Sequence, residues 1–173
     1  MSKVLIVAEH ADGKANPSTA KCVACATEIP EAEIHVVVLS DNSDAAANEI
    51  ATLSSVSKVI RVDRPDNENQ LAAVLAPQVA AMAEGYTHVF GPSTTFGRDL
   101  MPRIAALLGV NQVSDIMEVL GSHSFKRPVY AGNAIATVEA PSDLIVVATV
   151  RAASYRAVSS DAGAPVESVD TAA

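Results

Sequence analysis

The stretch THVFGPSTTFGRDLMPRIAALL, residues 87–108, decides how the chain folds. It begins with a short apolar run at residues 89–90, which a Gly-Pro pair interrupts. Three hydroxyl side chains follow at residues 93–95, and a helical pattern then opens at Gly97. This order predicts a strand, a loop and a helix, with hydroxyls and Arg98 where the unpaired N–H groups of a helix point. Such a loop can bind an anion or can cap the helix without a ligand, and the stretch alone leaves both open.

The same order of elements repeats along the first 109 residues. Each predicted strand is an apolar run rich in β-branched residues, typical of a strand buried on both faces. Asn16 and Pro17 mark the start of the first helix, and Pro77 and Pro102 lie inside two others, where we expect a bend. Alternating strands and helices predict a parallel sheet with right-handed crossovers and helices on both faces. The expected strands are 3–8, 34–39, 57–62 and the run before residue 91, and the expected helices are 16–28, 44–53, 67–84 and 96–108.

After Gly109 the pattern changes to strands separated by short turns. Gly-Asn at residues 132–133 and Pro-Ser-Asp at residues 141–143 are turn signals. Beyond Tyr155 the chain loses all periodicity, so we expect one domain over residues 1–157 and a linker or frayed tail over residues 158–173. We also expect an antiparallel or mixed extension on one edge of the parallel core, built from strands at 112–120, 125–131, 133–140 and 144–151.

Composition and charge argue against several function classes. The 173 residues carry 12 Lys and Arg against 20 Asp and Glu, a net charge of −8. Because the basic residues form no cluster beyond Lys126 and Arg127, we expect no nucleic-acid binding. The longest apolar run, residues 71–83, is too short and too interrupted to cross a bilayer, and residues 4–8 are too few for a secretory signal. We therefore expect a cytoplasmic protein with no membrane insertion.

Two groups of side chains are candidates for chemistry. Cys22 and Cys25 have the spacing of redox dithiols, but they fall in the second and third turns of a helix, away from the N-terminal dipole that lowers a thiol pKa. We expect them to be small buried apolar residues. His10 follows a strand and stands beside Glu9, and ligands bind at the carboxyl ends of strands in open α/β sheets. Glu9, His10 and the loop at residues 91–98 are therefore expected to share a rim.

The loop at residues 91–98 lacks the phosphate-binding pattern G-x-x-x-x-G-K-[ST], and G-x-G-x-x-G is absent from the sequence. Thr95 or Ser93 as the N-cap, with Asp99 in the first turn, explains much of its composition without a ligand. The sequence has no nucleophile with an adjacent base and no metal-ligating pair at helical spacing. We expect neither a catalytic site nor a metal site in this chain.

A second polar turn, RPVYAGNAIAT at residues 127–137, places Arg127, Tyr130 and Asn133 around a tight bend. It is either a hairpin with polar edges or a turn that faces an interface or a ligand. The sequence favours neither.

Four motifs, in order, resemble the N-terminal domain of the electron transfer flavoprotein alpha subunit. They are KVLIVAEH (3–10), GPSTTFGRDLMPRIAALLGVNQVSDI (91–116), RPVYAGNAIATV (127–138) and ATVRAASY (148–155). The resemblance implies a three-layer, open, mainly parallel twisted sheet. Such a fold is Rossmann-like, of the adenine-nucleotide alpha-hydrolase kind, here with an antiparallel C-terminal extension.

The family resemblance also implies a function. It suggests a heterodimer with a beta subunit that carries electrons on one FAD, from flavoprotein dehydrogenases to a quinone oxidoreductase or another acceptor. In the family a second alpha domain holds most of the FAD, so no cofactor-binding residue is assigned in these 173 residues. We expect FAD in the complete heterodimer and none bound to this chain alone.

Three hypotheses follow for the chain itself. The first is that it is a scaffold and interaction domain of an electron carrier. The second is that it is an adenine-nucleotide-binding module of the same fold. The third, which rests on Cys22 and Cys25 alone, is that it is a thiol redox protein. Under the first hypothesis the polar loop and turn face a neighbouring domain or subunit. The interface candidates are Ser93, Thr95, Arg98, Asp99, Arg127, Tyr130 and Asn133.

Overall fold

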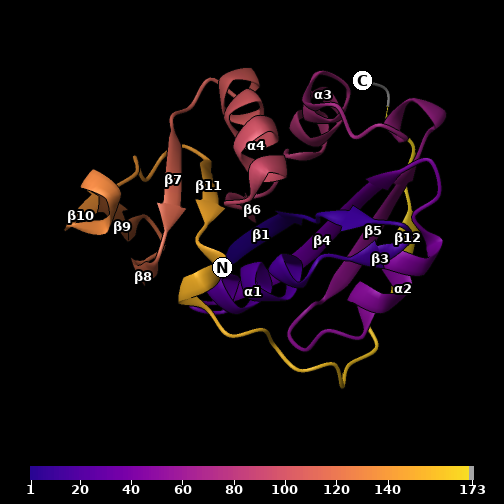
Figure 1. The fold of residues 1–173 in the computed structure, drawn as a ribbon, viewed down its shortest axis with the longest axis horizontal. Coiled ribbons are helices and arrows are strands. Elements are labelled where there is room, and N and C mark those ends of the chain that lie inside the picture. The colour runs from indigo at the N-terminus through magenta and orange to yellow at the C-terminus, as the bar shows by residue number, and fades with distance from the viewer. Residues whose placement is uncertain (172–173) are drawn as a thin grey trace.

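The computed structural model describes residues 1–171 of the chain. Its centre is a parallel sheet of seven strands in the order β12-β5-β4-β1-β6-β11-β7. Helices α1 and α2 cover one face of this sheet, and α3 and α4 cover the other (Figure 1). The strands are β1 (Ser2–Val7), β4 (Ala32–Ser40), β5 (Lys58–Asp63), β6 (His88–Pro92), β7 (Gln112–Ile116), β11 (Val146–Val150) and β12 (Val166–Ser168). The helices are α1 (Pro17–Ala26), α2 (Asp44–Ala51), α3 (Ala72–Met82) and α4 (Thr95–Leu107).

The alternation of side chains along β1 shows why its apolar run is continuous. Val4 and Ile6 pack on the side of α1 and α2, whereas Leu5 and Val7 pack on the side of α3 and α4. All four side chains are fully buried, because successive residues of a strand point to opposite faces and both faces carry helices. The predicted three-layer α/β fold is confirmed.

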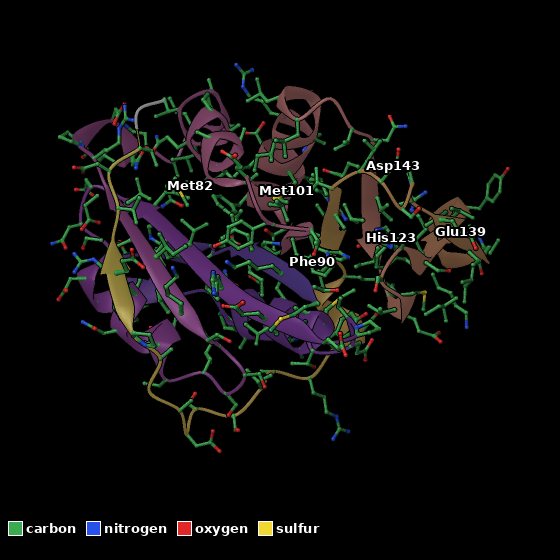
Figure 2. The ribbon with its side chains drawn as sticks, turned by 180° about the vertical axis from the view of Figure 1, so that it is seen from behind. Met82, Phe90, Met101, His123, Glu139 and Asp143 are labelled. Carbon is green, nitrogen blue, oxygen red and sulfur yellow. The ribbon has the colours of Figure 1, made fainter. Side chains whose placement is uncertain are left out.

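The same two layers meet β6 from opposite sides. Phe90 packs in the core on the α1 side and Met101 of α4 packs in the core on the other (Figure 2). Pro102 lies inside α4 and Pro77 inside α3, as the sequence predicted.

The helix predicted over 67–84 is shorter in the structure. A 3-10 turn, η1 (Pro65–Asn67), precedes it, and α3 begins only at Ala72. Gln70 has a left-handed φ of 48°, which interrupts a helix at this point. Asn67 and Gln78 are both buried, and Nε2 of Gln78 donates to Oδ1 of Asn67 at 2.7 Å. A side-chain amide pair therefore anchors the segment that we had assigned to the helix.

The C-terminal extension differs most from the prediction. A separate antiparallel sheet, in the order β10-β9-β8, lies at one end of the molecule (Figure 1). It contains β8 (Glu118–Gly121), β9 (Ser124–Val129) and β10 (Ala134–Glu139), with η2 (Tyr130–Gly132) between the last two. β11 does not belong to this extension: it is parallel to both β6 and β7 and joins the core sheet between them.

The position of β11 has a simple physical cause. All five of its residues are buried, which requires packing on both faces, and only the interior of the core sheet provides that. The predicted single strand at 112–120 divides into β7, at the edge of the core, and β8, in the small sheet. The small sheet thus forms the long connection that two parallel strands need.

A two-stranded hairpin that we did not predict follows β1. It pairs β2 (His10–Ala11) with β3 (Lys14–Ala15). Asp12 and Gly13 connect them with φ values of 51° and 73°, as a type I′ turn requires. The Asp-Gly pair is a recognised hairpin signal, so the sequence did contain the information.

The segment after residue 157 is more ordered than expected. Backbone N–H groups of Ala162 and Ala164 donate to carbonyls at the end of α2, and β12 then pairs in parallel with β5. Of the two expectations for residues 158–173, a linker or a frayed tail, the frayed tail was wrong for residues 158–171, because the free edge of β5 supplies the hydrogen bonds that a three-residue strand needs. Residues 172 and 173 lie outside the described residues. A domain boundary at residue 157 stays a prediction. In the described residues, no helix has the length and apolar character needed to span a membrane.

Candidate functional site

The loop between β6 and α4 is only two residues long. Its second residue, Thr94, is the N-cap of α4 and has an extended backbone, with φ −89° and ψ 176°. The Thr94 hydroxyl accepts a hydrogen bond from the N–H of Gly97 at 3.4 Å. Our prediction of Thr95 or Ser93 as the cap was wrong by one residue, and Asp99 lies beyond the first turn. The N-cap is the last non-helical residue before a helix, and three adjacent residues with hydroxyl side chains, 93–95, could each take this position. Composition alone does not distinguish between them.

Gly97 allows α4 to begin directly against the end of β6. A Cβ at this position would lie 1.7 Å from the carbonyl oxygen of Pro92, so no other residue fits without a shift of the helix. This close approach places the next residue, Arg98, beside the carboxyl ends of the strands.

The expected rim at the ends of β1 and β6 exists. From β1 the sheet continues through β4 and β5 on one side and through β6 and β11 on the other, so the β1/β6 boundary is its topological switch point. We call Glu9, His10, Ser18 and Thr94 the switch-point rim. A carboxylate oxygen of Glu9 accepts from the Thr94 hydroxyl at 2.8 Å and from the Ser18 hydroxyl at 3.3 Å.

The polar groups of the switch-point rim bond to one another and to the backbone. His10 is buried, and its Nε2 donates to the carbonyl of Leu39 at 2.8 Å. The side-chain amide of Gln70 in turn donates to the carbonyl of His10 at 3.2 Å. The polar groups at the place where such sheets hold nucleotides are therefore hydrogen-bonded within the chain itself.

A second group of polar side chains surrounds an open cleft at the ends of β6, β11 and β7. The cleft has a volume of about 420 Å³, and an adjoining hollow of about 360 Å³ shares several of its walls. The backbone N–H of Ser93 donates to the carbonyl of Val150, and that of Arg151 donates to the carbonyl of Ile116, which brings the three strand ends together. We call Ser93, Arg98, Asp115, Arg127 and Arg151 the arginine cleft.

The guanidinium groups of the arginine cleft come from different elements. Arg98 lies in α4, Arg127 in β9, and Arg151 between β11 and η3 (Ala152–Ser154). The Nε of Arg127 donates to the carbonyl of Ser114 at 2.7 Å, and the Nε of Arg151 lies 3.9 Å from a carboxylate oxygen of Asp115. Asp115 has a left-handed φ of 59°, and its N–H donates to the Thr149 hydroxyl.

The structure divides the seven interface candidates into two sets. Ser93, Arg98 and Arg127 line the arginine cleft, whereas Thr95, Asp99, Tyr130 and Asn133 are exposed and do not line it. In the second set, the side-chain amide of Asn133 donates to the carbonyl of Tyr130 at 2.9 Å and closes the η2 turn.

Three residues of the cleft region were missed by sequence reasoning. Arg151 follows a buried strand directly, so the rule that ligands bind at carboxyl ends of strands could have identified it. Asp115 and Gln112 had no such signal, because we placed them inside a longer strand of the extension. Their positions depend on β7 ending where it meets β11.

The two cysteines are buried, as expected, and so are the strand histidines His35 and His88. Cys22 and Cys25 are both fully buried, and burial raises the pKa of the Cys25 thiol to about 12 and that of Cys22 well above its usual value. This environment disfavours the reactive thiolate. His88 is fully buried, its Nε2 donates to the carbonyl of Ser122 at 2.7 Å, and burial lowers its pKa.

His88 also anchors the small sheet to the core. Its ring centroid lies 5.9 Å from that of His123. His123, labelled in Figure 2, lies in the turn between β8 and β9. Among residues 1–171, no group of three or more His, Cys, Asp or Glu side chains is placed to hold a metal ion.

Comparisons with known proteins identify relatives along almost the whole chain. The family model described as "Electron transfer flavoprotein domain" matches residues 4–173. An "Electron transfer flavoprotein subunit alpha" from Pseudomonas aeruginosa is 42% identical over 96% of this chain and 53% of its own length. One from Paracoccus denitrificans is 36% identical over 98% of this chain and 54% of its own length. A mitochondrial one from Dictyostelium discoideum is 37% identical over 89% of this chain and 45% of its own length.

The chain thus spans about half the length of the curated relatives it matches. The family match extends over both the switch-point rim and the arginine cleft. This chain belongs to the electron transfer flavoprotein family, as a relative of its alpha subunits.

Proposed function

We propose that this chain is the scaffold and interaction domain of an electron transfer flavoprotein alpha subunit. In this proposal it contacts a beta subunit, catalyses no reaction itself and acts in the cytoplasm. The complete heterodimer carries electrons on one FAD, held mainly by a second alpha domain, from flavoprotein dehydrogenases to a quinone oxidoreductase or another acceptor. The observation that supports this most directly is the similarity of named alpha subunits over 96% of the chain.

The small antiparallel sheet is our candidate for the surface that contacts the beta subunit. It lies at one end of the molecule, beyond the edge strand β7 (Figure 1). Two large apolar side chains near its η2 turn are exposed to solvent: Tyr130 at 83% and Ile135 at 58%. Aromatic and aliphatic side chains left in water at neighbouring positions favour burial against a partner.

A binding experiment tests this surface. The purified chain is titrated with the electron transfer flavoprotein beta subunit of the same organism, and complex formation is measured by calorimetry and by light scattering after gel filtration. We expect the double variant Tyr130→Ala, Ile135→Ser to weaken the complex by about tenfold or more, since exposed anchors of this size contribute at least 1–2 kcal/mol when buried in an interface.

Leu107→Ser is the matched control. Leu107 is 51% exposed on α4, a helix outside the small sheet, so its loss should leave the affinity for the beta subunit unchanged. A wild-type chain that forms no complex, or a double variant that binds as tightly as Leu107→Ser, contradicts the proposal.

The position of the flavin has its own test. The purified chain should be colourless and should not retain FAD through gel filtration. A yellow preparation with bound flavin would overturn our assignment of the cofactor to a second alpha domain.

A further inference from the structure

The arginine cleft combines three guanidinium groups with one carboxylate in an acidic protein. Arg98, Arg127 and Arg151 line the cleft and its adjoining hollow together with Asp115, a local excess of two positive charges, whereas the whole chain carries −8. Like charges gathered in a cleft repel one another, so their convergence needs a compensating anion to become favourable.

Most of the donor capacity of these arginines is unused. Each guanidinium has five N–H donors. Within residues 1–171, the Arg98 side chain has no hydrogen bond or ion pair, and the Arg127 side chain has only the one to Ser114. The contact of Arg151 with Asp115, at 3.9 Å, is at the outer limit of an ion pair. Planar guanidinium groups with free donors match the oxygens of phosphate and carboxylate.

A buried hydrogen-bond acceptor in the adjoining hollow favours an anion that can itself donate a hydrogen bond. Gln112 lines this hollow, and its Nε2 donates to the Ser114 hydroxyl at 2.8 Å. Its Oε1 is buried and has no hydrogen-bond donor among the described residues. Hydrogen phosphate carries an O–H that can donate to such an oxygen, whereas sulfate and ionised carboxylates cannot.

The start of α4 adds to the positive potential. This helix has 13 residues and no acidic side chain of its own in the first turn, and the Glu9 carboxylate that bonds to its N-cap Thr94 belongs to the switch-point rim. Ser93, immediately before the N-cap, lines the cleft and offers a hydroxyl. A phosphate group held here would thus meet guanidinium groups, a hydroxyl and a helix N-terminus from one side of the sheet.

We propose that the arginine cleft is a binding site for a phosphate group. The residues that bind it are Arg98, Arg127 and Arg151, with Ser93 and Gln112 contributing a hydroxyl and an amide oxygen. Among the residues that the structure describes, no aromatic or large apolar side chain lines the cleft, so the site recognises the phosphate and not an attached base. This inference goes beyond the scaffold function, and it can fail or succeed independently because its test uses the chain alone.

The test is a titration of the purified chain with inorganic phosphate, measured by calorimetry at low ionic strength with chloride as the background anion. We expect saturable binding that Arg98→Gln and Arg151→Gln each weaken by about tenfold or more, because each substitution removes charge-assisted hydrogen bonds to the anion. Arg103→Gln is the matched control, because it removes the same charge from the same helix outside the cleft. Denaturant unfolding of each variant verifies that the fold is kept.

Two further anions distinguish the source and the chemistry of the ligand. Sulfate should bind at least several-fold more weakly than phosphate, because it offers no O–H to Gln112. AMP should bind no more tightly than inorganic phosphate. The proposal is overturned by an absence of saturable phosphate binding, by equal losses in Arg98→Gln and Arg103→Gln, or by sulfate binding as tightly as phosphate. AMP binding tenfold tighter would replace the phosphate site with a nucleotide site.

Discussion

The switch-point rim and the arginine cleft lie on either side of the same loop, but they differ in how far their polar groups are hydrogen-bonded within the chain. Thr94 donates to Glu9 and closes the rim, whereas its neighbour Ser93 lines the open cleft. In the rim, the carboxylate of Glu9 and the imidazole of His10 are satisfied by neighbouring groups. In the cleft, the guanidinium of Arg98 has no partner among the described residues.

A group of polar side chains can thus lie where ligands usually bind without being free to bind one. Both regions lie at the carboxyl ends of parallel strands, where ligands bind in such sheets. The rim occupies the switch point itself, but its hydrogen bonds are internal and stabilise the fold. The cleft lies one strand further along the sheet, and most of the donors of its arginines are unpaired among the described residues. Hydrogen-bond satisfaction, rather than topology, indicates which of the two is free to bind.

The largest expected effect comes from a change that destroys both regions. In Gly97→Ala the new methyl group would overlap the carbonyl oxygen of Pro92, 1.7 Å away, and α4 must move away from β6. We expect the free energy of unfolding to fall by about 3 kcal/mol or more, as for severe overpacking. Guanidinium chloride unfolding measures it. Gly121→Ala, where a Cβ meets nothing within 4 Å, is the control and should change stability little. Equal stability of the two variants would show that α4 adjusts freely.

A second change breaks the rim alone. Thr94→Val removes the hydroxyl that both caps α4 and donates to Glu9. We expect a loss of about 1–2 kcal/mol in the free energy of unfolding, from the lost cap and the less satisfied carboxylate. Thr95→Val, at the exposed next position, should cost no more than about 0.5 kcal/mol. If both variants lose the same stability, the rim is not a structural unit.

The parallel core could be predicted because its signals are local. Residues 3–8 and 34–39 are continuous apolar runs, and only strands covered on both faces bury every residue. Asn16 and Pro17 likewise identified the start of α1, where the Asn16 side chain accepts from the N–H of Ser18. The fold class followed from the repetition of these units.

The position of β11 and the make-up of the cleft could not be predicted in the same way. A buried strand at 144–151 looks alike whether its neighbour is β10 or β6, and the difference depends on a pairing across more than fifty residues. Since Arg151 and Asp115 reach the cleft only through that pairing, their meeting was not visible in the sequence. Arg98 and Arg127 were identified as candidates, but as an interface and not as walls of one cleft.

A third prediction concerns the strand that the two regions share. Burial lowers the pKa of His88, at the amino end of β6, below its ordinary value of about 6.5. The neutral ring is therefore favoured in the folded state, so its contribution is fully present above the unfolded pKa and is lost as the pH falls below it. The free energy of unfolding should decrease between pH 7 and pH 5.

The variant His88→Gln isolates this contribution. Glutamine can still donate to the carbonyl of Ser122 but does not titrate. Urea unfolding across the same pH range should therefore give a flatter profile than in the wild type. His35, whose pKa burial also lowers, stays in both proteins and keeps part of the slope. An unchanged profile in His88→Gln would mean that His88 does not couple pH to stability.

A substitution in the arginine cleft alone should change stability least. Arg98→Gln removes an exposed charge that has no partner within residues 1–171 and should change the free energy of unfolding by less than about 0.5 kcal/mol. The sign should be stabilising at low ionic strength, because the change relieves repulsion from the other cleft arginines, and salt should abolish it. Arg61→Gln is the contrasting variant: Arg61 bonds to Asp44 at 2.7 Å and to Asp63 at 2.6 Å, so its loss should destabilise the fold. If Arg98→Gln instead lowers the free energy of unfolding as much as Arg61→Gln does, the arginine cleft stabilises the fold as the switch-point rim does. Its guanidinium groups are then not available to a ligand.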